Sequence, residues 1–168
     1  TARSLIFVTP DAQRTMQTYL GACLNLTPAD VDPDTIKGSK VIYLEGYLWD
    51  PPQAKEAFLQ AARIAHGADR KVALTLSDSF CVERHRASFR DLVEHHIDIL
   101  IANEAEICSL WQVDSFDAAL QATRGKCEVA ALTRSEKGAV IFADGEVHVV
   151  DAVKVAKVVD TTGAGDLF

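Results

Sequence analysis

The sequence predicts an α/β fold with a mainly parallel central sheet. Short runs of aliphatic and β-branched residues alternate along the chain with longer segments whose apolar residues recur at helical spacing. Such alternation returns successive strands to the same direction, which gives a parallel sheet covered by helices on both faces. We find no repeats, low-complexity stretches or linkers, so residues 1–168 are expected to form one domain.

A β-hairpin opens the predicted order of elements. Residues Ser4–Val8 and Thr15–Tyr19 are rich in strand-forming residues and flank a turn at Thr9-Pro10-Asp11. The Thr27-Pro28 pair that follows is typical of a helix N-terminus, because threonine caps a helix and proline fits its first position. This helix should extend to about Ile36.

Strands and helices then alternate. Strands are expected at 41–44, 72–76, 97–102 and 129–133, and helices at 52–67, 82–95, 104–110 and 116–123. A second hairpin should pair 139–142 with 147–150, since the Asp144-Gly145 dipeptide between them favours a tight turn. Parallel sheets bind ligands beyond the carboxyl ends of their strands, so polar residues at those ends are the candidate functional residues.

The composition is that of a globular cytoplasmic protein. Hydrophobic residues make up 48% of the chain and charged residues 24%. With 17 basic and 24 acidic residues the net charge is −7, which argues against nucleic acid or an anionic membrane as a partner. We see no apolar run of membrane-spanning length and no signal peptide. Four scattered cysteines without a CxxC pair favour a reducing compartment over a disulfide scaffold.

The strongest functional pattern lies at the C-terminus, in the string Asp160-Thr-Thr-Gly-Ala-Gly-Asp166. Gly163, Ala164 and Gly165 are small enough for the backbone to approach a bulky ligand, and a helix that begins here would direct free N–H groups towards an anion. Asp166 beside bound negative charge suits a proton acceptor, and the two together suit phosphoryl transfer to a hydroxyl. A lone GxGD string also fits a strand-to-helix turn in which Asp166 is only a favourable acid of the first helical turn.

The complete string resembles the C-terminal signature of the PfkB (ribokinase-like) carbohydrate kinase family, which includes ribokinase, fructokinases and adenosine kinase. The resemblance implies a ribokinase-like α/β fold and an ATP-dependent kinase that phosphorylates a hydroxymethyl group. It also implies that Gly163, Ala164 and Gly165 form an anion hole, and that Asp166 is the catalytic base that deprotonates the attacking hydroxyl.

Two further segments resemble elements of the same family. Asn103-Glu104-Ala105-Glu106 alone fits an N-capped helix with acids in its first turn. As the family's N-x-x-E element, it implies that Asn103 lies near the phosphates of ATP and that Glu106 acts on Mg²⁺ through water. The segment 133–138 alone is a polar turn, but it resembles the family's T-x-G-x-x-G loop. That resemblance places Thr133, Ser135 and Gly138 at the nucleotide, with Ser135 where glycine is usual.

Other polar residues are less specific. Glu45 closes an apolar strand, which is unfavourable unless the carboxylate is paired. It either binds substrate hydroxyls, as the resemblance to sugar kinases suggests, or caps a neighbouring loop. The basic stripe Arg84–Arg90 is expected to face solvent, and Trp49 and Trp111 are expected to pack in the core.

The resemblance also bears on substrate and completeness. Segments 9–16 and 77–85 look similar to bacterial PfkB proteins usually assigned as adenosine kinases, which implies adenosine as substrate, with a sugar such as ribose or a ketose as the alternative. PfkB kinases are considerably longer than 168 residues. We therefore expect a partial kinase domain, the middle and later part, with most lid strands upstream. Family members often dimerise through these strands, so a homodimer is one expectation. An inactive nucleotide-binding module is the other reading of the chain.

Overall fold

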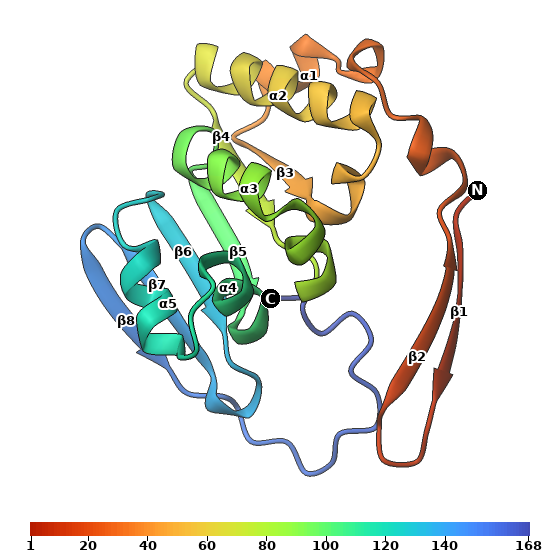
Figure 1. The fold of residues 1–168 in the computed structure, drawn as a ribbon, viewed down its shortest axis with the longest axis vertical. Helices are drawn as coiled ribbons and strands as arrows, with labels where there is room; N and C mark the ends of the chain where they lie inside the picture. Colours follow the sequence, from red (N-terminus) through yellow and green to blue (C-terminus); the bar gives the residue numbers. More distant parts are fainter.

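The computed structural model describes residues 1–168, and its centre is a six-stranded mixed sheet (Figure 1). The strand order is β3-β4-β5-β6-β7-β8, which is also the order along the chain. The first four strands are parallel, and the last two add as antiparallel neighbours. The strands are β3 (Val41–Glu45), β4 (Lys71–Thr75), β5 (Ile99–Asn103), β6 (Val129–Thr133), β7 (Ala139–Ala143) and β8 (Glu146–Val150). The predicted mainly parallel sheet is confirmed.

The connecting helices cover one face of this sheet. They are α2 (Pro52–Gly67), α3 (Ser79–His95), α4 (Glu104–Trp111) and α5 (Phe116–Thr123). Because each parallel strand lies beside the preceding one, right-handed crossovers put every connecting helix on the same side. Leu44, Leu74 and Leu100 face these helices and are buried in the core. On the opposite face Val41 and Tyr43 are 44% and 57% exposed, so the 168 residues show helical cover of one face.

Aromatic residues and small residues pack between the helices and the sheet. The stripe of α2 that contacts the core is largely alanine, which lets the helix lie close to its neighbours. Trp49 packs against Phe58 and Phe89, with ring centroids 5.5 and 6.1 Å apart. The Trp111 indole N–H donates to Thr123 Oγ1 at 2.8 Å. Both tryptophans therefore pack as predicted.

The basic stripe of α3 does not face solvent alone, contrary to the sequence expectation. The Arg86 and Arg90 guanidinium groups donate to the backbone carbonyls of Ser109 and Leu110 at 2.8 and 2.7 Å. These carbonyls belong to the last turn of α4, where a helix has no internal donors left. Arginine side chains from α3 supply the missing donors and fasten the two helices together.

A separate hairpin precedes the sheet and stands apart from it (Figure 1). Strands β1 (Arg3–Val8) and β2 (Arg14–Tyr19) pair in antiparallel register from Arg3 opposite Tyr19 to Val8 opposite Arg14. All residues of both strands are exposed. This two-stranded sheet is the part of the chain that fits the lid strands expected from the resemblance, most of which were expected upstream.

The segment after the hairpin differs from the prediction. A short 3₁₀ turn, η1 (Gly21–Asn25), is followed by a second, η2 (Pro28–Asp30), whose start is closed by a reciprocal cap between Thr27 and Asp30. The helix α1 (Pro33–Gly38) then starts afresh. One continuous helix to Ile36 is wrong because a proline forces the preceding residue out of helical conformation: Asp32 has φ −85° and ψ 109°. Asp32 instead caps α1 by accepting from Asp34 N.

The C-terminal residues form turns instead of a regular helix. Residues 151–168 belong to neither helix nor strand, and the valines between 153 and 159 are exposed. One bond of α-helical type occurs, from Leu167 N–H to the Gly163 carbonyl at 3.2 Å. A stable helix needs several such bonds in succession. None of the helices elsewhere in the chain is both long and apolar enough for a membrane span.

Candidate active site

The predicted site residues gather at the edge of the sheet where the parallel strands end. Glu45 is the last residue of β3 and lies opposite Thr75 of β4. Asn103 ends β5 and lies directly opposite Thr133, the last residue of β6. Three segments that are far apart in the sequence are thus brought to one edge, because parallel neighbours in register end at the same level.

A cavity of about 630 Å³ joins this edge to the C-terminal motif. Its polar groups include the carboxylates of Glu45 and Asp166, beside Gly165. The other walls are mostly apolar and come from β3, β5, α2, the segments before them and the tail. They include Leu26, Val31, Leu48, Phe58, Ile101 and Phe168. The size and the few polar groups on apolar walls are typical of a small-molecule site.

The two carboxylates in this cavity influence each other. Partial burial raises the pKa of Glu45, and the negative charge of Asp166 raises it further. Burial also raises the pKa of the neighbouring Tyr43 hydroxyl. The cavity therefore favours ligand groups that donate hydrogen bonds to carboxylates, which sugar hydroxyls do. The structure brings the predicted base and the predicted substrate residue to the same space.

Backbone donors are available beside Asp166. In the turns of the terminal motif, Ala164 N–H donates to the Thr161 carbonyl at 3.2 Å and Asp166 N–H to the Gly163 carbonyl at 3.1 Å. The N–H groups of Gly163 and Gly165 donate to no protein acceptor. Gly163 has φ 74°, a left-handed conformation that suits glycine. Two free backbone donors next to a carboxylate can receive an anion, as an anion hole requires.

Asn103 and Glu106 form a capping box at the start of α4. Asn103 Oδ1 accepts from Glu106 N at 2.9 Å, while the Glu106 carboxylate accepts from Asn103 N at 2.9 Å and from Asn103 Nδ2 at 2.6 Å. Glu106 is only 5% exposed, and its burial raises the pKa of the carboxyl. The hydrogen bonds therefore confirm that this segment caps α4.

The loop after β6 lies next to this capping box. Arg134 Nε donates to Glu104 Oε2 at 3.2 Å and so ties the loop to the first turn of α4. Ser135 has φ 53°, in the left-handed region that favours glycine, which agrees with the glycine usual at this place in the family pattern. Gly138 has φ 84°, and a Cβ there would come within 1.9 Å of the Val150 carbonyl oxygen. Thr133 thus ends β6 opposite Asn103, and the turn η4 (Ser135–Lys137) follows and is closed by Gly138.

The sequence analysis missed Arg14. The guanidinium of Arg14 donates to Thr161 Oγ1 and connects the hairpin to the terminal motif. It lies in a second cavity of about 680 Å³, together with residues of the turn at 11–13, the β4–α3 loop and the tail; these include Asp11, Gln13, Met16, Asp78, Phe80 and Val158. Arg14 is the one cation of segment 9–16, and that signal could have drawn attention to it in a chain with a net charge of −7.

Comparison with known proteins identifies the family. Residues 1–168 match the pfkB family carbohydrate kinase. The chain belongs to the PfkB family. A probable sugar kinase from Rhizobium etli CFN 42 is 55% identical, with a TM-score of 0.95 over 99% of this chain and 51% of its own. The adenosine kinase from Sinorhizobium meliloti is 52% identical, with a TM-score of 0.94 over 99% of this chain and 51% of its own.

More distant PfkB-like structures share the fold alone. A candidate ribokinase II from E. coli, in complex with ATP and Mg²⁺, is 21% identical, with a TM-score of 0.82 over 97% of this chain and 54% of its own. The chain spans about half the length of all three structures. The resemblance read from the terminal string and the ribokinase-like fold class are both confirmed.

Proposed function

We propose that the protein containing this chain is an ATP-dependent kinase that phosphorylates a hydroxymethyl group of a small molecule, with adenosine as the acceptor. The observation that carries this proposal is the cavity in which Asp166 and Gly165 face Glu45 at the carboxyl edge of the sheet. A base, a residue with a free backbone donor (Gly165) and a hydrogen-bond acceptor for hydroxyls share one space there. Family membership supports the same reaction class.

In this proposal Asp166 removes the proton of the attacking hydroxyl, and the phosphoryl group moves from ATP to that oxygen. The N–H groups of Gly163 and Gly165, which have no protein acceptor, stabilise negative charge on the transferred group. Ala164 separates them without adding bulk. Glu45 accepts from a substrate hydroxyl and so orients the acceptor. Loss of one preorganised donor of this kind typically lowers the rate by about 10²–10³-fold.

ATP is assigned to the adjoining part of the edge. Asn103, Thr133, Ser135 and Gly138 lie together beside the start of α4, and the E. coli relative with ATP and Mg²⁺ has the same fold. No group of three or more acidic, histidine or cysteine side chains forms a metal centre. The donor set fits Mg²⁺ that is held mainly by phosphates, because Mg²⁺ commonly takes one or two carboxylates and keeps several waters. Glu106 would hold such a water, and the ion would supply neutralisation of phosphate charge.

The identity of the acceptor and the oligomeric state are the more specific parts of the proposal. The Sinorhizobium relative at 52% identity is an adenosine kinase, which favours adenosine, while the Rhizobium relative at 55% favours a sugar as the second candidate. Segments 9–16 and 77–85, whose resemblance suggested adenosine, meet at the second cavity. A homodimer through the hairpin is supported by exposed apolar side chains, namely Leu5, Phe7 and Tyr19.

An ADP-release assay on the full-length protein tests the proposal, with Mg·ATP and either adenosine or a panel of sugars. Turnover with adenosine supports it, whereas turnover only with a sugar keeps the mechanism and replaces the substrate. Asp166→Asn should nearly abolish turnover and leave ATP affinity largely unchanged, and Asp151→Asn, in the same exposed tail, should leave both unchanged. ATP binding without turnover for any acceptor would instead favour the inactive nucleotide-binding module.

A further inference from the structure

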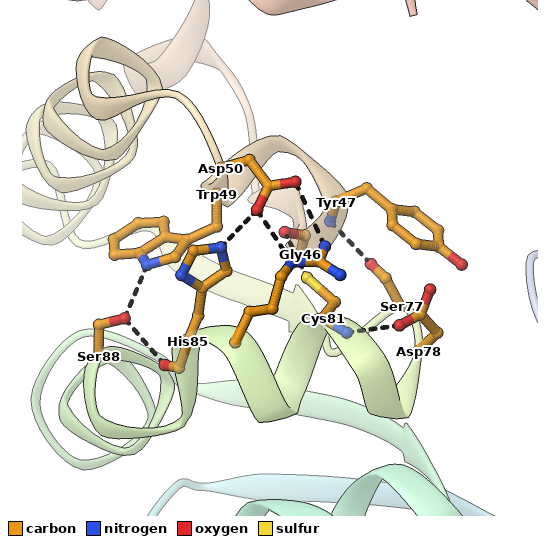
Figure 2. A network of polar contacts seen from close by, with 10 residues as sticks. Gly46, Tyr47, Trp49, Asp50, Ser77, Asp78, Cys81, His85 and Ser88 are labelled. Atoms are coloured by element: carbon orange, nitrogen blue, oxygen red, sulfur yellow. Dashed lines mark hydrogen bonds and ion pairs between the residues drawn. The ribbon is translucent and has the colours of Figure 1, made fainter. Parts of the chain in front are cut away.

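The segment directly after Glu45 is hydrogen-bonded at almost every residue to the β4–α3 loop or to α3 (Figure 2). This segment is η3 (Gly46–Trp49) followed by Asp50. The Gly46 carbonyl accepts from Cys81 Sγ at 3.3 Å, and Tyr47 N–H donates to Ser77 Oγ at 3.2 Å. Gly46 is also packed tightly, since a Cβ at this position would lie 2.9 Å from the carbonyl oxygens of Thr75 and Leu76. The beginning of the segment is thus fixed against the end of β4.

The end of the segment is fixed to α3 by side chains. Asp50 Oδ1 lies 2.5 Å from His85 Nε2, and the same carboxylate accepts from Arg84 at 3.3 and 3.4 Å. Trp49 Nε1 donates to Ser88 Oγ at 2.8 Å, and that hydroxyl donates to the His85 carbonyl at 2.9 Å. Figure 2 shows Trp49, Asp50, His85 and Ser88 gathered on one side of α3.

These contacts meet where α3 departs from helical geometry. His85 has φ −121° and ψ 18°, which divides α3 into two helical parts. A break inside a helix usually has a local cause such as proline or an inserted group, and no proline is present in α3. In α3 the break lies at His85 itself, whose imidazole contacts Asp50. The hydrogen bond to His85 also lowers the pKa of Asp50, so the carboxylate is ionised at neutral pH.

Asp50 and His85 together connect the walls of the two cavities. On one side, Asp50 ends the segment that carries Leu48 and follows Glu45, both of which line the first cavity. On the other side, the second cavity is lined by Asp78, the N-cap of α3, and by Phe80 in its first turn. We propose that Asp50 and His85 are positioning residues for the acceptor: their contact sets Glu45 and Leu48 relative to the start of α3. This inference rests on the kinase function proposed above.

If Asp50 and His85 only stabilised the fold, their replacement would lower the stability of the protein and would not act on the acceptor KM. Asp50 is 45% exposed and His85 is 15% exposed, and a contact to a carboxylate that stays open to solvent contributes little to stability. Loss of the pair should therefore change the position of the Glu45 segment more than the stability of the fold. Small displacements of an orienting group are costly in catalysis, so the acceptor KM is the sensitive quantity.

The test uses the full-length protein with Mg·ATP and adenosine. Asp50→Ala and His85→Ala should each raise the acceptor KM about 10-fold, while the ATP KM stays within about twofold. The urea midpoint should be unchanged in Asp50→Ala, whereas His85→Ala also removes an imidazole that packs against Phe89. His85→Gln, which keeps a donor for Asp50, should restore the acceptor KM. The control is Asp91→Ala, since Asp91 also pairs with a histidine, His95 at 3.1 Å, but at exposed positions near the far end of the same helix. Hydrogen exchange of residues 46–50 should increase in the two alanine variants alone.

The outcomes separate the two proposals. An active wild type whose alanine variants keep their acceptor KM refutes the positioning role and leaves the kinase function standing. The positioning role is equally refuted if Asp91→Ala gives an effect of the same size, or if the rise in KM in Asp50→Ala accompanies a loss of stability. If one alanine variant fails to fold, the other, which loses the same contact, carries the test by the same criteria. A wild type without turnover for any acceptor refutes the kinase function, and the positioning role with it.

Discussion

Replacement of Asn103 by alanine separates the structural role of this residue from its proposed role at ATP. The side chain makes two hydrogen bonds within the capping box, one to Glu106 N and one to the buried Glu106 carboxylate at 2.6 Å. Loss of an N-cap costs about 1 kcal/mol, and loss of a hydrogen bond to a charged buried group costs about 1.5–3 kcal/mol. We therefore expect Asn103→Ala to lower the free energy of unfolding by about 3 kcal/mol.

Urea denaturation at pH 7 measures this loss, and Asn103→Ser is the matched variant. Serine keeps a cap acceptor but has no amide donor for Glu106, so its cost should be about 2 kcal/mol. A loss below about 0.5 kcal/mol in Asn103→Ala would show that the capping box contributes no stability. If Asn103 also contacts the phosphates, both variants should raise the KM for ATP in the folded enzyme. Unchanged ATP kinetics in Asn103→Ser would remove Asn103 from the nucleotide site.

Two further predictions concern stability. Burial raises the folded-state pKa of Glu106 above its unfolded value, so folding favours the neutral carboxyl. The wild type therefore loses stability as the pH rises from the unfolded to the folded pKa. Glu106→Gln, which can keep the capping box, should have the same free energy of unfolding as the wild type below about pH 4 and a higher one at pH 7. Urea titrations at both pH values measure this difference, and equal stability at pH 7 would contradict the prediction. Gly46→Ala should cost about 1–3 kcal/mol, because the new methyl group meets two backbone carbonyl oxygens, and an unchanged melting temperature in calorimetry would show that the β4 end yields easily.

Segments with strong local patterns were predicted closely. The helix at 116–123 and the strand at 129–133 have the predicted bounds, and the Asp144-Gly145 turn joins β7 to β8 as expected. The start of α3 was predicted three residues late, at Val82 instead of Ser79. Asp78 caps this helix by accepting from Cys81 N at 2.6 Å, a short-range signal that was present in the sequence.

Features that depend on distant partners were not predictable in this way. The basic stripe of α3 was assigned to solvent because nothing near Arg86 or Arg90 in the sequence indicates that the last carbonyls of α4 lie beside them. Arg14 was missed for the same reason, since its partner Thr161 is 147 positions away. The joint placement of Glu45 and Asp166 depends on how the tail returns to β3, which no local pattern specifies.

The order of the strands has a consequence for folding. Because β3 to β8 pair only with their neighbours in the chain, the sheet can grow one unit at a time, and no strand pairing joins residues more than 30 positions apart. The bond between Arg14 and Thr161 is the opposite case, since it joins positions 147 apart. The chain can therefore reach a complete sheet before the hairpin and the tail meet. The proposed site should therefore be the last part to assemble and the first to open, which hydrogen exchange would register as early loss of protection at the tail.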